Sequence, residues 1–378
     1  MRLLFVTPRW GEVAGGAERA MRGFATRCCD GYDVEVATTC AIDHHTWRNE
    51  LPAGVEREGD LTVRRFEVTQ HGGHTPGHVG TSYLGQVRAL AASVWSEPMQ
   101  RFLVEQAERF DAILLAPYLF GTTFWSAAAQ PSRALLVPCL HDEPEARTAP
   151  MRALLGRVRG CIFLSRAEEA LARTLAPVRT SRVVGVGVDV APPLPAERVA
   201  EIRAQLGLQR PYVVSVGRVE EGKRADALVD LMAAYRRRHG DLDLVLAGSG
   251  PYRPPGWVKR IGFLDDEAKR AVVAGAIASV SASRMESFSL VLLEAWSEGT
   301  PTLSDAACGP MTEHTRDSGG GLVYHGAGSF TAGLQTLLQP GARERFGAAG
   351  RAYVLDRYSW DAVRDRFRSA VEELACAS

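Results

Sequence analysis

Short, mostly apolar runs alternate with longer amphipathic stretches along most of the chain. Runs such as 3–7, 34–38, 112–116 and 212–216 are too short for helices and are predicted as buried strands. The stretches that follow many of these runs repeat apolar residues at helical spacing. Strands that alternate with helices are typical of a parallel sheet with helices on both faces, so the pattern predicts an α/β fold.

A proline-rich stretch interrupts this alternation. Residues 192–195 read Pro-Pro-Leu-Pro, and proline density of this kind marks a linker. A chain of 378 residues is comfortable for two domains. We therefore predict one Rossmann-like domain over 1–190 and a second over 191–357. A last helix is expected in 358–378, with Ser359 as its N-cap.

Three stretches have a less regular pattern. Residues 42–59 are polar and are predicted to be irregular. Residues 83–110 are predicted to form one or two helices that Pro98 interrupts, because proline removes a helical hydrogen bond. Residues 310–314 follow a predicted strand and are expected to lie in a loop.

The histidine-glycine stretch 70–80 invites a metal-site interpretation. It holds His71, His74 and His78 among several glycines, but their spacing is not that of a helical pair of ligands. A mobile loop near an acceptor site is the alternative, and the role of this stretch stays open. Asp243 stands at the start of a predicted strand, where capping is expected rather than metal binding. We predict no metal site.

Composition excludes several classes of protein. Hydrophobic residues make up 46% of the chain and charged residues 23%, as in ordinary globular proteins. The formal net charge is zero, so no overall field favours nucleic acid or a membrane. No apolar run approaches the ~20 residues of a membrane span, and the apolar N-terminus is too short for a signal peptide. The seven cysteines lack metal-like spacing and suit reduced thiols. We expect a cytoplasmic location, with peripheral contact to a membrane left open, as is the oligomeric state.

The richest candidate site follows the strand predicted at 277–281. Glu286 lies in the loop between this strand and a helix that starts near Leu290, and Glu294 lies in that helix, eight positions later. Ligands of open α/β sheets bind outside the carboxyl ends of the strands, and helix N-termini favour anions. Both carboxylates are suited to accept hydrogen bonds from sugar hydroxyls. The alternative is one ordinary loop acid and one surface acid.

Three other strand ends carry candidate chemistry. Gly15 and Gly16 lie in a loop between a strand and a helix, where backbone N–H groups can approach a phosphate. His141 stands at the tip of a predicted strand. Arg218 and Lys223 flank a glycine turn, and paired cations bind phosphates strongly. A tight turn, a capping histidine and a solvated ion pair are the respective alternatives.

These motifs occur in the order of a known family. Glu-x7-Glu at 286–294 resembles the motif of retaining glycosyltransferases of family 4, which have the GT-B fold. Gly-Gly-x-Glu at 15–18, the histidine at 141, Gly-Arg-x4-Lys at 217–223 and the closing Tyr-Ser-Trp at 358–360 resemble further parts of that family. Two departures are Ser289 and Arg224, which stand where glycine is usual.

The resemblance implies a role for each matching residue. His141, Arg218, Lys223 and Glu286 would be catalytic, and Glu18 and His141 would contact the acceptor. Glu294 would hold the nucleotide ribose. The full donor-binding set implied by the resemblance is Gly15, Gly16, Arg218, Lys223, Phe263, Glu286, Ser287, Phe288, Ser289, Leu290 and Glu294. The last helix would return to the first of two Rossmann-like domains that face a central cleft.

The implied activity is metal-independent, retaining transfer of a hexose-type sugar from a nucleotide diphosphate sugar to an acceptor hydroxyl. A UDP-sugar is favoured, with GDP- and TDP-sugars open. The acceptor is expected in polysaccharide, glycolipid or secondary-metabolite assembly, and no cofactor or nucleic acid is expected. The rival interpretations are a sugar-nucleotide epimerase and a binding protein without turnover. The donor sugar and the acceptor are not identified by the sequence.

Overall fold

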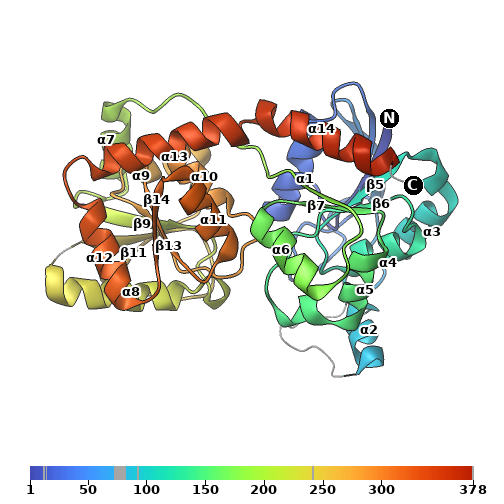
Figure 1. The fold of residues 1–378 in the computed structure, drawn as a ribbon, viewed down its shortest axis with the longest axis horizontal. Coiled ribbons are helices and arrows are strands. Elements are labelled where there is room, and N and C mark those ends of the chain that lie inside the picture. The colour runs from blue at the N-terminus through green and yellow to red at the C-terminus, as the bar shows by residue number, and fades with distance from the viewer. Residues whose placement is uncertain (12, 14, 72–81, 92, 241, 377–378) are drawn as a thin grey trace. The chain divides into compact units, whose positions relative to one another are not determined.

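The computed structural model describes residues 1–11, 13, 15–71, 82–91, 93–240 and 242–376. Its contacts divide the chain into two compact units. The first unit holds Met1–Gly187 together with Trp360–Ser378, and the second holds Val188–Ser359 (Figure 1). The first boundary lies close to the one expected at residue 190.

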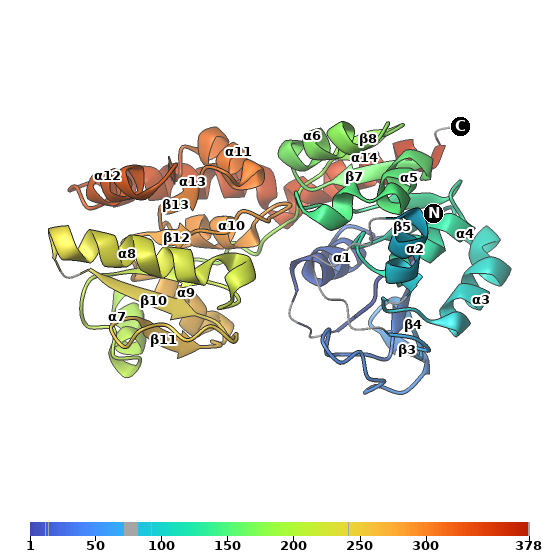
Figure 2. The ribbon, with the colours of Figure 1, turned by 90° about the horizontal axis from the view of Figure 1, so that it is seen from below.

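The first unit is built on an eight-stranded sheet in the order β3-β4-β2-β1-β5-β6-β7-β8. The described strand pairs are parallel except β3 with β4, which lie at one edge (Figure 2). The central strands are almost wholly buried, as expected for a sheet covered on both faces. The strands are β1 (Arg2–Val6), β2 (Asp33–Thr39), β3 (Gly54–Glu58), β4 (Leu61–Phe66), β5 (Ala112–Leu115), β6 (Ala134–Leu136), β7 (Gly160–Phe163) and β8 (Ser181–Val183).

Helices cover this sheet, and the last of them comes from the end of the chain. They are α1 (Gly16–Arg27), α2 (Tyr83–Ala91), α3 (Glu97–Gln106), α4 (Gly121–Ala129), α5 (Ala149–Arg157), α6 (Arg166–Leu175) and α14 (Trp360–Cys376), with short 3₁₀ turns at Ala107–Arg109 and Pro144–Arg147. Helix α14 packs on α1, because the ring of Phe367 stacks on that of Phe24 with centroids 4.6 Å apart. A Cβ on Gly23 of α1 would lie 2.0 Å from the Trp360 ring, so glycine is needed for this approach.

The second unit has a six-stranded parallel sheet in the order β11-β10-β9-β12-β13-β14. The chain builds outward from β9 in one direction and then from β12 in the other, so the strand order reverses between β9 and β12. Ligands of open α/β sheets bind at such a point. The strands are β9 (Tyr212–Val216), β10 (Asp243–Ala247), β11 (Lys259–Gly262), β12 (Ser279–Ser281), β13 (Thr302–Asp305) and β14 (Gly321–Tyr324).

Two layers of helices enclose the second sheet (Figure 1). Helices α8 and α12 share one apolar core with the sheet, and α9 and α10 share another. The helices are α7 (Ala196–Gln205), α8 (Ala225–His239), α9 (Asp266–Ala274), α10 (Leu290–Ser297), α11 (Gly309–Ser318), α12 (Ala327–Leu337) and α13 (Ala342–Tyr358), with a 3₁₀ turn at Glu221–Lys223.

Three local predictions were wrong. Part of the stretch 42–59 forms β3, an edge strand that is mostly exposed and therefore lacks an apolar period. The stretch 83–110 does hold two helices, α2 and α3, but Pro98 does not lie between them; it lies in the first turn of α3, where the missing N–H is tolerated. Residues 310–314 lie in α11, which likewise has a proline in its first turn. Most of the stretch 70–80 lies outside the described residues.

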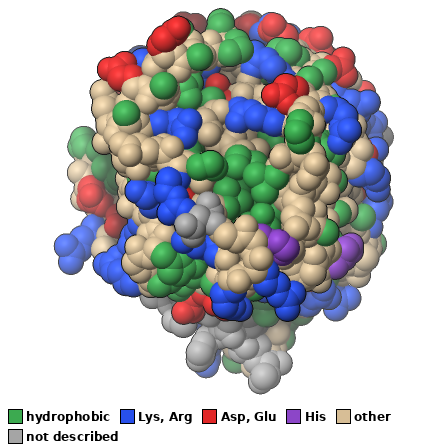
Figure 3. Space-filling view, turned by 90° about the vertical axis from the view of Figure 1, so that its left-hand side faces the viewer, with side chains coloured by type: hydrophobic (Ala, Val, Ile, Leu, Met, Phe, Trp, Pro, Cys, Tyr) green, Lys and Arg blue, Asp and Glu red, His purple; other side chains and the backbone are tan. Residues whose placement is uncertain are grey.

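The surface carries both signs of charge. On the face drawn in Figure 3, basic side chains surround a hydrophobic area and acidic ones lie along the upper edge. Within the described ranges, no helix is both long and apolar enough to cross a membrane. Of the seven cysteines, six are buried as free thiols and Cys376 is exposed.

Candidate functional site

The loop between β12 and α10 and the loop after β9 meet at the reversal of strand order in the second unit. Lys223 Nζ donates a hydrogen bond to Glu286 Oε1 at 2.7 Å. Their side chains are 28% and 16% exposed, so the pair is shielded but reachable from solvent. Two candidate residues that lie 63 positions apart in the chain are thus in direct contact.

Arg218 lies in the same loop as Lys223 but has a different partner. Its Nη1 is 3.0 Å from Glu220 Oε1, and its side chain is 58% exposed. The preceding Gly217 has φ +133°, and a Cβ on Gly248 would lie 1.9 Å from the Gly217 carbonyl oxygen. Glycine therefore allows the loops after β9 and β10 to touch through their backbones. The predicted arginine is present in the loop, and its guanidinium stands in solvent.

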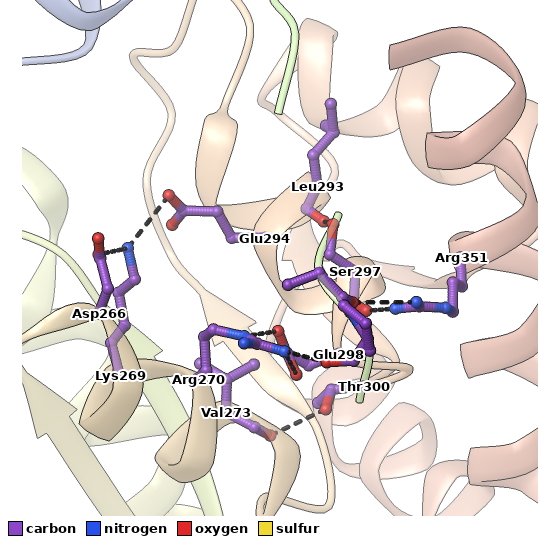
Figure 4. Close-up of polar contacts among 12 residues, drawn as sticks. Asp266, Lys269, Arg270, Val273, Leu293, Glu294, Ser297, Glu298, Thr300 and Arg351 are labelled. Atoms are coloured by element: carbon purple, nitrogen blue, oxygen red, sulfur yellow. Dashed lines mark hydrogen bonds and ion pairs between the residues drawn. The ribbon is translucent and has the colours of Figure 1, made fainter. Parts of the chain in front are cut away.

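Glu294 lies on α10 and is contacted from the neighbouring helix α9. Lys269 Nζ is 3.4 Å from Glu294 Oε1 and 3.2 Å from Asp266 Oδ1. The next residue of α9, Arg270, donates from Nε to Glu298 Oε1 at 2.6 Å, one turn beyond Glu294 (Figure 4). Arg270 also donates to the Pro192 carbonyl. The two acids differ in exposure, at 17% for Glu294 and 6% for Glu298. The more open acid is the one that the sequence motif selects.

The residues between Glu286 and α10 form the turn that starts the helix. Phe288 is buried, and its ring meets His314 and Tyr358 edge-on, with centroids 4.8 and 5.2 Å away. Ser287 and Ser289 are also buried, and Leu290 is the first residue of α10. The N–H groups of the first turn of a helix lack intrahelical partners, so this turn presents donors beside the Lys223–Glu286 pair.

Phe263 stands at the end of β11 and is unusually open. Its side chain is 81% exposed, which is high for a large aromatic residue. It directly follows Gly262, which has φ +73° and so turns the chain away from the strand. An exposed ring at a strand end is suited to stacking on a flat ligand group.

Glu18, a candidate residue of the first unit, forms a buried ion pair with Arg9, and the candidates Gly15 and Gly16 stand just before it in the chain. Gly15 precedes α1, and a Cβ there would overlap the Glu18 carboxylate, which would then have to shift. Gly16 begins the helix. Glu18 was predicted to contact an acceptor, but its side chain is turned inward and pairs with the buried Arg9. This carboxylate therefore joins the first turn of α1 to Arg9, which lies just after β1.

His141 follows β6 and lies in an acidic surrounding. Its Nδ1 is 3.6 Å from Glu143 Oε1, and the Tyr118 hydroxyl donates to the same oxygen at 2.6 Å. Burial raises the pKa of Glu143. The His141 side chain is 29% exposed, so one part of the ring is open to solvent while the acid lies behind it.

A buried acid holds the segment that carries His141. Glu168 accepts hydrogen bonds from the backbone N–H groups of Leu140 and Leu164, both at 2.6 Å. It is 1% exposed, and burial raises its pKa to about 8. One side chain thus joins the segment after β6 to the start of α6. Glu168 was not predicted as a functional residue, because in the sequence it looks like an ordinary helix acid three positions after Ser165.

Two further charged groups were also missed. Lys269 is one of only three lysines in the chain, and this scarcity could have marked it. Asp305, at the end of β13, accepts from both Arg224 and Arg284 at 2.8 Å. Arg224 adopts a left-handed conformation, φ +54°, at a position where the family resemblance expects glycine. No local pattern in the sequence shows that these three charges meet.

Comparison with known proteins matches the second unit to a family. Residues 199–353 match the model described as "Glycosyl transferases group 1". This match covers most of the second unit. The chain is also 28% identical over 358 residues to the D-inositol 3-phosphate glycosyltransferase of Salinispora tropica, and this match covers 82% of the chain and 72% of that relative.

Solved structures match the whole chain. The sucrose-phosphate synthase of Thermosynechococcus elongatus aligns with a TM-score of 0.72 and 19% identity, covering 100% of both chains. The Anabaena protein Alr3699/HepE, solved in complex with UDP, aligns with a TM-score of 0.73 and 17% identity, covering 99% of this chain and 100% of that one. The fold is GT-B. The predicted α/β fold class is therefore confirmed.

Proposed function

We propose that the protein transfers a sugar from a nucleotide diphosphate sugar to an acceptor hydroxyl, with retention of anomeric configuration and without a metal ion. The observation that carries this proposal is the Lys223–Glu286 pair at the reversal of strand order, inside the stretch that matches the group 1 glycosyltransferase model. A bound donor would separate the pair: the ammonium would turn to the diphosphate, and the carboxylate would accept from a sugar hydroxyl. The ion pair therefore balances the charges of the Lys223 ammonium and the Glu286 carboxylate until the donor binds.

The diphosphate is the leaving group and gains negative charge in the transition state. In this proposal, Lys223, Arg218 and the N–H groups at the start of α10 stabilise that charge. Lys223 and the helix N–H groups are held by the fold before the reaction, which makes their electrostatic effect larger than that of mobile water. Because protein cations supply the positive charge, the transfer is expected to continue in the presence of a metal chelator.

The remaining candidate residues position the donor and the acceptor. Glu294 is proposed to hold the ribose hydroxyls, and the Phe263 ring to stack on the base. His141, in the first unit, is proposed to contact the donor sugar and the acceptor. The Arg9–Glu18 pair is proposed to hold the loop of Gly15 and Gly16 in place. A hexose-type sugar is the proposed transferred group.

UDP is the proposed nucleotide, and it is also the ligand in one of the matching structures. Polysaccharide, glycolipid and secondary-metabolite precursors remain the acceptor classes. Inositol phosphates are the first acceptors to test, because a relative that matches most of the chain bears that acceptor in its name.

The first test is a thermal-shift screen of UDP, GDP, TDP and ADP, with and without EDTA. A ligand at a hundred times its Kd adds about 2.7 kcal/mol to the free energy of unfolding. We expect one diphosphate, UDP, to raise Tm, and EDTA to leave the shift unchanged. No shift with any of the four would contradict the proposal.

The second test is the rate of release of nucleoside diphosphate from the sugar nucleotide. Arg218→Ala should lower this rate at least tenfold, about 1.4 kcal/mol. Arg316→Ala is the matched control, because Arg316 lies in α11 and is 70% exposed. A rate within threefold of wild type for Arg218→Ala would rule out the diphosphate role of Arg218.

A further inference from the structure

Ser289 begins α10 in an unfavourable backbone conformation. It is the N-cap residue of the helix and has φ +73° and ψ +72°. This left-handed region disfavours any residue with a Cβ, and glycine would occupy it without strain. Strained residues of this kind gather at functional sites when the surrounding structure holds them.

The Ser289 hydroxyl does not cap its helix, whereas the hydroxyls of two other N-cap serines do. Ser96 and Ser165 have extended backbones, with φ −131° and −145°, and their hydroxyls accept from the N–H groups of Met99 and Glu168. Ser289 makes no such capping bond. The left-handed backbone thus leaves the first N–H groups of α10 without the usual side-chain acceptor.

The hydroxyl is also buried without compensation. Ser289 is 5% exposed, and its Oγ has no hydrogen-bond partner among the described residues. A buried polar group without a partner is costly, and most such groups in proteins are satisfied. Ser289 combines a left-handed backbone with a buried, unpaired hydroxyl at the start of a helix and three positions after Glu286, and this combination favours a ligand contact there.

Packing around the preceding residue holds this arrangement. Phe288 is 2% exposed and is fixed edge-on against the rings of His314 and Tyr358. The turn therefore cannot relax easily into an ordinary N-cap. The hydroxyl stays at the N-terminus of α10, in the same loop as Glu286, whose carboxylate accepts a hydrogen bond from Lys223 of another loop.

We infer that the Ser289 hydroxyl donates a hydrogen bond to the diphosphate of the donor. The inference rests on the proposed function and adds a specific contact to it. A phosphate oxygen satisfies the buried hydroxyl, and hydrogen bonds to charged groups are the stronger ones. Glycine at this position would remove both the strain and the contact. Serine therefore lowers the stability of the folded protein and raises its affinity for the diphosphate.

The test compares Ser289→Gly and Ser289→Ala with the full-length wild type. Both variants lack the hydroxyl, but only glycine relieves the strain. We expect the Kd for UDP to rise about tenfold in both, equal to about 1.4 kcal/mol. The Kd for uridine, measured by competition, should stay unchanged because uridine has no phosphate. Tm without ligand should be roughly 2 °C higher for Ser289→Gly than for Ser289→Ala.

Each other outcome overturns the inference and identifies what failed. If wild type binds UDP and both variants bind it equally well, the hydroxyl contact is wrong while the proposed function stands. If uridine weakens as much as UDP, the substitutions disturb the whole site rather than one phosphate contact. If wild type binds neither UDP nor any other diphosphate of the screen, the inference fails together with the proposed function.

Discussion

Glu294 of α10 and Glu298, the residue that caps the C-terminal end of that helix, allow one substitution to be tested against a matched control nearby. Glu294 and Glu298 are one turn apart, and each contacts a cation from α9 (Figure 4). If Glu294 holds the ribose, Glu294→Gln should weaken nucleotide binding and barely change stability. Glu298→Gln should do the reverse, because Glu298 is buried and joins α10 to α9.

The expected sizes follow from the two environments. A hydrogen bond to a charged group contributes about 1 kcal/mol more than a neutral one, so two ribose hydroxyls lose ~2 kcal/mol, or roughly 30-fold in Kd. The Lys269–Glu294 contact is 3.4 Å long and partly exposed, so its loss should cost about 0.5 kcal/mol of stability. Glu298→Gln should cost about 1.5 kcal/mol and lower Tm by roughly 4 °C.

The assay is calorimetric titration with UDP and with 2′,3′-dideoxy-UDP, together with thermal melts. Glu294→Gln should bind UDP about 30-fold more weakly than wild type does. It should bind the dideoxy nucleotide as wild type does, because the ribose contact is already absent there. An equal loss for both nucleotides would refute the ribose role, as would the same loss of UDP affinity in Glu298→Gln.

Two further predictions concern the first unit. Gly23→Ala should lower Tm by several degrees, because the new methyl group would overlap the Trp360 ring and cost about 1–3 kcal/mol. Gly328→Ala is the control in the same melts, because Gly328 also lies in a helix, lacks a positive φ and has open space around it. The pKa of Glu168 is raised from 4.5 to about 8, so the folded state holds this proton more tightly than the unfolded state. Wild type should therefore lose stability relative to Glu168→Gln as pH rises from about 4.5 to about 8 and change little above that, and parallel pH profiles of the two proteins in thermal melts would contradict this.

Much of the fold could be predicted because buried parallel strands carry an unmistakable signal. Strands such as β1 and β9 are mostly apolar on both faces, since both faces of the sheet are covered. The edge strand β3 could not be found in this way, because it is mostly exposed and its side chains show no apolar alternation. Residues 310–314 were predicted as a loop, but they lie in α11, whose first turn contains Pro310, a position where proline is favoured.

The candidate site was predictable only where its residues follow strand ends. Lys223 and Glu286 belong to different loops, yet parallel strands bring both loops to one edge, and the structure places the two groups 2.7 Å apart. Side-chain direction was not predictable in the same way. Glu18 follows a glycine loop as the resemblance expects, but its carboxylate turns inward to Arg9. Which way a carboxylate points depends on a partner elsewhere in the chain.

The pairs on α9 and α10 show why spacing alone does not separate a binding acid from a structural one. Consecutive cations, Lys269 and Arg270, contact acids that are one helical turn apart, so the local pattern is nearly the same for both. Arg270 contacts both oxygens of Glu298 and also donates to the Pro192 carbonyl. These bonds give the Arg270–Glu298 pair a structural role. Lys269 is shared between Glu294 and Asp266, and Asp266 is 93% exposed. Burial and the number of bonds to the cation, rather than the spacing of the acids, therefore separate the two roles.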